Sequence, residues 1–151
     1  MPSAKPQARV VLALFAATLV VGLILLVAFD TDVQSVDARE LVSRRHAARQ
    51  FFAGDYVFLA LYGPLSALAL WRFGAALGAG WIRLGAGLLL LASAFDAAEN
   101  ALLLSATGSV SQDTVDAAHT VAVPKTIFFV AGAAFALAAN WRAGRVLRAP
   151  E

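Results

Sequence analysis

One segment near the N-terminus, Val10 to Phe29, contains no charged side chain and reads VVLALFAATLVVGLILLVAF. About 20 residues of α-helix cross the ~30 Å hydrocarbon layer of a bilayer, and this segment has that length. Lys5 and Arg9 precede this segment, as basic residues precede the apolar region of a signal peptide. The segment is longer than the usual ~7 to 15 apolar residues of a signal peptide, and no A-x-A cleavage pattern precedes Asp30. We therefore expect a permanent transmembrane helix.

The whole chain has the composition of a membrane protein. Of its 151 residues, 60% are hydrophobic and 15% are charged, and the mean hydropathy is +0.74, a balance that soluble domains of this size do not show. Apolar segments predict further transmembrane helices at residues 52–73, 81–105 and 118–141. Because the connections are short, we expect a single integral membrane domain over residues 1–151, an all-α antiparallel bundle of four transmembrane helices.

Several classes of function are disfavoured by the residues that the chain lacks. Cysteine is absent, which excludes disulfides, thiolate metal sites and a cysteine nucleophile. The chain has no HExxH motif or histidine pair, and we expect His46 and His119 near the membrane surface, so no metal and no cofactor is predicted. The net charge of +2 comes from basic clusters beside apolar segments, which indicate membrane orientation and no nucleic-acid partner.

A polar stretch, residues 30–50, separates the first two apolar segments. Asp37 and Glu40 have the spacing of a capping box, which predicts a short amphipathic helix that rests on the membrane surface and continues into the second transmembrane helix. Within that second helix, Gly63 and Pro64 predict a bend, because proline removes a backbone N–H and its ring clashes with the preceding turn.

Lysine and arginine predict the orientation of the bundle. If the helices alternate in direction, the two termini and the connection at residues 74–80 share one side, with Lys5, Arg9, Arg72, Arg83, Arg142, Arg145 and Arg148. The other side has Arg39, Arg44, Arg45 and Arg49. Trp71, Trp81 and Trp141 fall on the richer side, as an interfacial aromatic belt would. We predict a multi-pass protein of the cell (inner) membrane with both termini in the cytoplasm.

Asp55, Asp96, Glu99 and Lys125 are ionisable residues that lie within or at the edge of the predicted transmembrane helices, apart from the interfacial residues near the helix ends. An unpaired charge near the bilayer centre costs ~2.5 to 3.5 kcal/mol on insertion scales, so such residues mark functional sites by default. Counted along their helices, the last three lie roughly 9 to 13 Å below the outer surface, and Asp55 is shallower.

Helical phase places these groups on inward faces. At 100° per residue, one face of the third transmembrane helix carries Ser93, Asp96, Glu99 and Asn100, and one line along the second carries Asp55, Tyr62 and Ser66. On the last helix, the face with Lys125 also has the small residues Gly132 and Ala136, which permit close helix packing. We expect a buried polar pocket that opens outward, formed by Asp55, Tyr62, Asp96, Glu99, Asn100 and Lys125.

This pocket is acidic, because three carboxylates face one ammonium group. Either carboxyl groups retain a proton, or a cation binds, or arginines of the amphipathic segment fold over the mouth, and we favour the first. An alternative applies to Lys125: if Pro124 is the first helical residue, the lysine lies at the rim and extends to the interface.

The three elements Asp55-x2-Phe58-x3-Tyr62, Asp96-x2-Glu99-Asn100 and the lone Lys125 resemble those of a group of small uncharacterised bacterial four-helix integral membrane proteins. This group has a D-x2-F-x3-Y element in helix 2 and D-x2-E-N in helix 3. The resemblance spans roughly residues 35 to 140 and implies a topology and a shared pocket, without a substrate. By architecture alone, the chain is also similar to sterol-isomerase-like membrane folds with acidic pockets.

The leading functional hypothesis is a membrane protein that binds a small molecule, a lipid or protons. Asp96 and Glu99 would form the acidic pair and Asn100 would orient it, while Lys125 supplies the counter-charge and Asp55 with Tyr62 forms the outer gate. One alternative is a membrane-embedded enzyme that uses Asp96 and Glu99 for acid/base chemistry on an apolar or lipid substrate. Another is a structural or assembly subunit, with a homo-oligomer or a membrane protein as partner.

Overall fold

The computed structural model describes residues 4–28, 37–108 and 111–149, and this part of the chain is helical without any strand. The elements are α1 (Ala4–Ala28), α2 (Ala38–Ser43), α3 (Arg45–Ala60), the π-helix η2 (Leu61–Leu65), α4 (Ser66–Ala76), α5 (Gly80–Ala106) and α6 (Gln112–Arg148). Because α3, η2 and α4 follow one another without a break, they form one long rod. The all-helical class expected from the sequence is confirmed.

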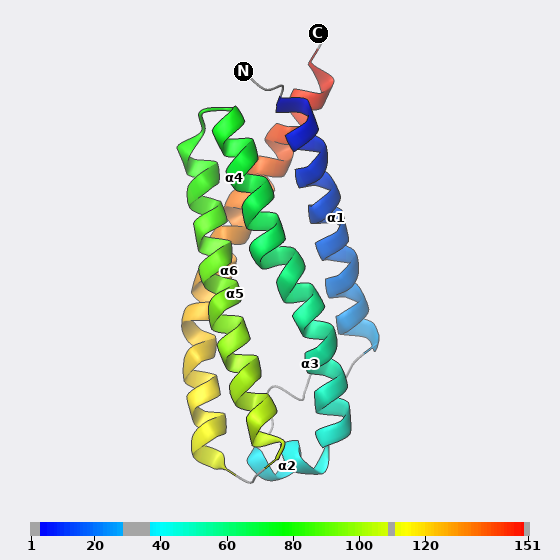
Figure 1. Ribbon diagram of the computed structural model, residues 1–151, viewed down its shortest axis with the longest axis vertical. Coiled ribbons are helices and arrows are strands. Elements are labelled where there is room, and N and C mark those ends of the chain that lie inside the picture. Colours follow the sequence, from blue (N-terminus) through cyan, green and yellow to red (C-terminus); the bar gives the residue numbers. More distant parts are fainter. Residues whose placement is uncertain (1–3, 29–36, 109–110, 150–151) are drawn as a thin grey trace.

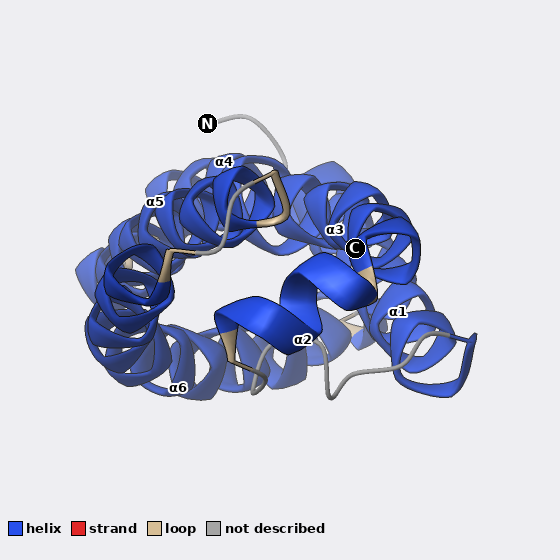
Figure 2. Ribbon diagram, turned by 90° about the horizontal axis from the view of Figure 1, so that it is seen from below, coloured by secondary structure: helices blue, strands red, loops and turns tan. Residues whose placement is uncertain are grey.

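Four long rods lie side by side along the axis of the molecule, namely α1, α3–η2–α4, α5 and α6 (Figure 1). The start of α1 and the end of α6 lie at the same end of the molecule (Figure 1). This end also carries the connection between α4 and α5, and we call it the tryptophan end because Trp71, Trp81 and Trp141 belong to it. At the opposite end α2 lies across the rods, as the view from below shows (Figure 2); we call this the α2 end.

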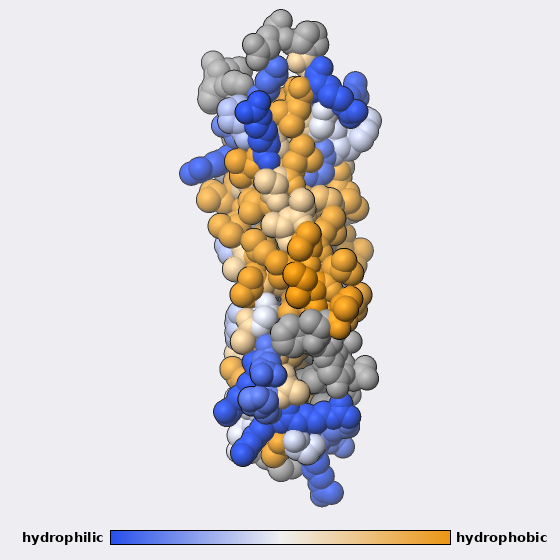
Figure 3. All heavy atoms as spheres, turned by 90° about the vertical axis from the view of Figure 1, so that its right-hand side faces the viewer, coloured by the Kyte–Doolittle hydropathy of each residue, from blue (hydrophilic) through white to orange (hydrophobic). Residues whose placement is uncertain are grey.

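All four rods are long and apolar enough to cross a membrane, over Ala4–Val27, Arg45–Ala76, Gly80–Ala106 and Gln112–Arg148. An apolar band separates two polar ends on the face shown in Figure 3. The four expected helices are therefore present, but three of them extend several residues beyond the predicted limits. Each of these three helices continues with polar residues beyond its apolar part, and a hydropathy pattern does not detect these residues as helical. The predicted end of the first helix, Phe29, lies outside the described residues.

The pair Gly63-Pro64 produces a π-helical turn within the second rod rather than an interruption of the helix. Pro64 has no N–H to donate, so the regular pattern of α-helical hydrogen bonds fails locally. The Ser66 N–H donates to the carbonyl of Leu61, five residues earlier, and the Ser66 hydroxyl donates to the same oxygen at 2.6 Å. This widened turn keeps the backbone satisfied in an apolar environment and determines where Tyr62 lies.

The expected capping box at the start of the amphipathic helix is half formed. The Asp37 side chain accepts from the Glu40 N–H at 2.9 Å, while the Glu40 carboxylate pairs with Arg44 at 2.8 Å. The apolar residues Ala38 and Leu41 of α2 are 1% and 0% exposed, because they pack against the ends of the rods. The helix therefore covers the end of the bundle.

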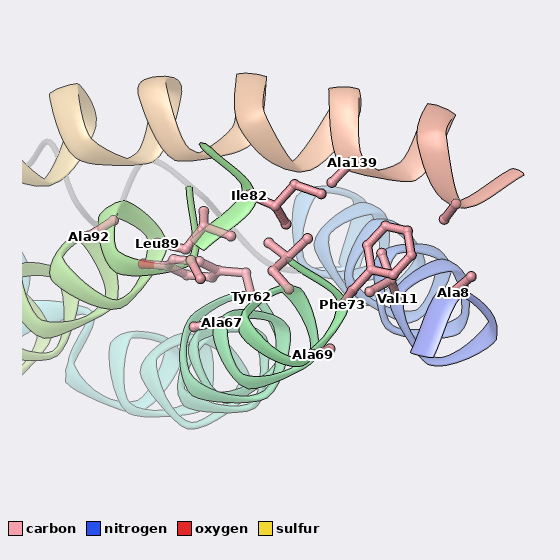
Figure 4. Packing of buried hydrophobic residues seen from close by; sticks show 13 residues of the cluster. Ala8, Val11, Tyr62, Ala67, Ala69, Phe73, Ile82, Leu89, Ala92 and Ala139 are labelled. Carbon is pink, nitrogen blue, oxygen red and sulfur yellow. The ribbon is translucent and has the colours of Figure 1, made fainter. Parts of the chain in front are cut away.

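Two apolar cores hold the rods together. The tryptophan-end core joins α1, α4, α5 and α6, with Phe73, Ile82 and Val11 among its members (Figure 4). Gly132 of α6 lies against Leu89 of α5, and a Cβ at that position would come within 2.8 Å of the leucine Cδ2. The small face predicted on the last helix thus permits close packing of α6 on α5.

The α2-end core is a separate cluster of buried apolar residues. It consists of Ala38, Leu41, Ala48, Phe51, Phe52, Leu103, Ala106, Val115 and Ala118. These residues come from α2, α3, α5 and α6, so the cluster fills the bundle where α2 covers it.

The tryptophans lie at the molecular surface of their end. Trp71, Trp81 and Trp141 are 53%, 37% and 64% exposed. The Arg83 guanidinium lies 5.7 Å from the ring centroid of Trp71, and that of Arg145 lies 5.0 Å from Trp141. Such cation–π pairs fit an interfacial belt of amphipathic rings.

Candidate functional site

The residues singled out in the sequence converge from four elements. Asp55 is on α3, Tyr62 on η2, and Lys125 on α6. Asp96, Glu99 and Asn100 lie on one face of α5. All are buried apart from the Lys125 side chain, which is 19% exposed. We call these residues the acidic cluster.

Asp96 is the centre of the acidic cluster. The Tyr62 hydroxyl donates to its Oδ2 at 2.6 Å, and the Lys125 ammonium donates to its Oδ1 at 3.2 Å. Lys125 also forms an ion pair with Glu99 Oε2. One ammonium group therefore bridges two carboxylates, and both oxygens of Asp96 have a donor, as buried carboxylates require.

A second pair extends the cluster toward the α2 end. The Asn100 amide donates to Asp55 Oδ2 at 2.6 Å. Asn100 is fully buried, and its Oδ1 has no hydrogen-bond partner among the described atoms. Together with the three carboxylates, this unpaired oxygen gives the cluster an excess of acceptors over donors.

Lys125 lies within the cluster and not at a helix start. The last helix begins at Gln112, so Pro124 is an internal residue of α6. The alternative in which Pro124 opens the helix and Lys125 extends from the rim is wrong. The polar residues before Ala118 predict a later start for this helix, but in the structure they form its first turns.

The arginines of the amphipathic segment do not fold over the cluster to neutralise its negative charge. Arg39, Arg45 and Arg49 are exposed, and Arg44 pairs with Glu40 of α2. Three carboxylates against Lys125 therefore leave the cluster acidic.

Within the described residues the cluster is covered at the α2 end, contrary to the expected outward opening. Phe52 precedes Asp55 by one turn, Leu103 follows Asn100 by one turn, and all of these side chains are buried. The α2-end core, which includes Ala38 and Leu41 of α2, therefore covers the cluster on this side. The sequence suggested an opening because it did not show that the polar segment folds back over the bundle.

A cavity of about 460 Å³ lies on the other side of the cluster, between α1, the η2–α4 region and α6. Its walls are mainly apolar, with Phe58, Leu70 and Leu137 among them, and Thr18, Ser66 and Asn140 add polar atoms. Its volume is within the ~300 to 1,000 Å³ range of small-molecule sites.

Tyr62 connects the cavity to the acidic cluster. Its ring forms part of the cavity wall, where Phe58 and Phe129 pack against it with centroids 5.0 and 5.2 Å away. Its hydroxyl points out of this aromatic contact to Asp96. Tyr62 therefore contacts both the cavity and the Asp96 carboxylate.

Sequence reasoning did not identify the contribution of α1 to this site. Gly22 and Thr18 line the cavity, and the Thr18 hydroxyl donates to its own helix at Leu14 O, 2.8 Å away. Asn140 also went unnoticed, although a polar amide within an apolar segment is a detectable signal. No cluster of three or more His, Asp or Glu suited to a metal ion occurs in the described ranges.

Comparison of the chain with family models, with curated proteins and with solved structures finds no match. The resemblance to small four-helix membrane proteins with D-x2-F-x3-Y and D-x2-E-N elements therefore stays a prediction.

Proposed function

We propose that this chain is an antiparallel four-helix bundle of the inner membrane, with cytoplasmic termini, that binds a lipophilic molecule carrying a cationic or hydrogen-bond-donating group. One observation carries the proposal: an apolar cavity shares the Tyr62 side chain with an acidic cluster. The apolar part of the ligand would occupy the cavity, and its polar group would replace Tyr62 as donor to Asp96.

The polar group, rather than the apolar part, would supply most of the binding free energy. Lipid tails are as apolar as the cavity walls, so transfer from bilayer to cavity gains little from the hydrophobic effect. A donor or cation within lipid lacks hydrogen-bond partners, whereas the cluster offers acceptors and a negative potential. The α2-end core covers the cluster at the α2 end. The ligand would therefore enter from the bilayer beside α1, because only 11% of the most apolar stretch of α1 is buried.

A set of matched alkyl ligands tests this selectivity. Purified protein in zwitterionic nanodiscs receives dodecylamine, dodecanol or dodecanoate, and the shift in melting temperature reports binding to the folded state. We expect the amine to stabilise most and dodecanoate least. Asp96→Asn and Glu99→Gln each should weaken amine binding about tenfold or more, since hydrogen bonds to charged groups contribute ~1.5 to 3 kcal/mol.

Filling the cavity provides the second arm of the experiment. Ala133 of α6 lines the cavity, whereas its neighbour Ala134 is exposed. Ala133→Phe should abolish the response to dodecylamine, and Ala134→Phe should retain it. Equal responses of these two variants, or equal stabilisation by the amine and by dodecanoate, would contradict the proposal.

A structural or assembly role is the second candidate, because most polar atoms of the cluster are already paired with each other. In that case Asp96→Asn and Glu99→Gln would lower the melting temperature without any ligand, and no alkyl ligand would distinguish them from the native chain. A membrane-embedded acid/base enzyme would instead release a chemically altered lipid, detectable by mass spectrometry of the bound fraction.

A further inference from the structure

A second hollow, of about 260 Å³, lies between the start of α1 and the η2–α4 region. Its side walls include Val10, Leu65 and Leu68, which are 50%, 46% and 50% exposed. It is therefore a groove on the outer surface of the apolar band, where bilayer lipid would lie. Its polar lining comes from Gln7 and Arg72, which belong to the tryptophan end.

Among the described residues, the charges around this groove have one sign. Every described acidic residue lies in the half nearer the α2 end, and the described charged residues of the tryptophan end are all basic. Arg83 and Arg145 lie over tryptophan rings, and the Arg148 Nε donates to Gly144 O at 3.1 Å. Arg72 is exposed, and no carboxylate of the described ranges pairs with it.

Gln7 lines the groove and carries an unpaired hydrogen-bond acceptor. Its side-chain Oε1 is buried and has no hydrogen-bond partner among the described atoms. A buried unpaired amide oxygen is costly unless a donor reaches it, and the residue lines the same hollow as Arg72. An occupant that suits both residues has an anionic group for the guanidinium and a hydroxyl for the amide oxygen.

We infer that this groove is a binding site for an anionic glycerophospholipid with a hydroxylated headgroup, as in phosphatidylglycerol. One acyl chain lies along Val10 and Leu68, the phosphate pairs with Arg72, and a headgroup hydroxyl donates to Gln7 Oε1. Arginine suits the phosphate because its planar group forms two parallel hydrogen bonds, and basic pockets beside membrane helices recognise anionic headgroups. The inference stands on the groove alone and does not depend on the ligand of the larger cavity.

Native mass spectrometry of the full chain in detergent, with added phosphatidylglycerol or phosphatidylcholine of the same acyl chains, tests the site. We expect phosphatidylglycerol to be retained at least about tenfold better, and Arg72→Gln to remove most of this preference. Arg142→Gln is the matched control, since it removes the same charge at the same end but outside the groove. Soluble glycerol phosphate should not compete, which separates a lipid site from a phosphate site.

Gln7→Leu tests the headgroup hydroxyl separately. This variant should lower retention of phosphatidylglycerol several-fold and leave phosphatidic acid, which lacks that hydroxyl, unchanged. Equal losses from Arg72→Gln and Arg142→Gln would reduce the effect to general surface charge, and equal retention of phosphatidylcholine would show only non-selective lipid contact. Either result overturns the inference. The variants remain interpretable if circular dichroism shows native helix content.

Discussion

At the scale of single residues, the acidic cluster shows how a helix long and apolar enough to cross a membrane accommodates a carboxylate. Asp96 receives one donor on each oxygen, from Tyr62 and Lys125, which belong to different rods. The cost of burying the charge is therefore offset only when three rods are assembled. The same contacts make the Tyr62 hydroxyl a sensitive test of the arrangement.

Replacing Tyr62 by phenylalanine should destabilise the protein by roughly 1 to 3 kcal/mol, because Asp96 Oδ2 would lose its donor in a buried environment. The ring that lines the cavity remains, so packing changes little. The chain has two tyrosines, and the other, Tyr56, is 39% exposed, which makes Tyr56→Phe a matched control. Unfolding of both variants in mixed micelles measures the difference. Equal stability of the two variants would show that the Tyr62 hydroxyl does not stabilise Asp96.

At the scale of elements, the π-helical turn packs closely against α5 because Gly63 has no side chain. A Cβ on Gly63 would collide with the Cβ and hydroxyl of Ser93. Because Gly63 follows Tyr62 directly, the close approach of η2 to α5 also brings the tyrosine hydroxyl to Asp96. Gly63 therefore helps to position the Tyr62 side chain between the cavity and the acidic cluster.

We expect Gly63→Ala to destabilise the fold by about 1 to 3 kcal/mol through overpacking against α5. Adding Ser93→Gly should restore part of the loss, since it removes the atoms that the new methyl group meets. Gly87→Ala is the control, because a Cβ there meets nothing within 4 Å and alanine favours helix by up to ~1 kcal/mol. A Gly63→Ala variant as stable as the native chain in the same micelle assay would show that the contact relaxes without cost.

At the scale of the whole molecule, the rods differ in how much they are enclosed. In the most apolar stretches of α1 and α6 only 11% is buried, against 39% in the other two rods. Both therefore present most of their apolar surface outward, as expected for helices whose solvent is lipid. With the polar ends beyond this surface, the molecule has two sides that chemical labelling can distinguish.

Because the chain has no cysteine, single cysteines report its orientation without background. We expect a membrane-impermeant maleimide to label Asp113→Cys in right-side-out vesicles, and to label Ala75→Cys and Ala149→Cys only after permeabilisation. All three positions are exposed; the first lies at the start of α6, at the α2 end, and the others lie near the ends of α4 and α6, at the tryptophan end. Labelling of the opposite set would show the inverse orientation. Labelling of Ala75→Cys and Ala149→Cys on different sides would show that the helices do not cross the membrane in alternating directions.

The sequence by itself determined the class of fold and the members of the acidic cluster. Hydropathy predicts four long apolar helices because a helix in lipid must satisfy its backbone internally and cover its outside with apolar side chains. Helical phase places Asp96, Glu99 and Asn100 on one inward face because unpaired charges are costly in lipid. Both arguments concern one helix at a time, which is why a single sequence supports them.

Only the tertiary structure decided which donor meets which carboxylate, where the cluster is closed and where a ligand has room. The covering of the α2 end depends on how Leu41 packs on other rods, and the wall of the cavity depends on the close approach of Phe58 to Gly22, where a Cβ would lie 3.1 Å from the ring. Such distances arise from the mutual placement of rods, and hydropathy and helical phase contain no term for contacts between residues far apart in the chain.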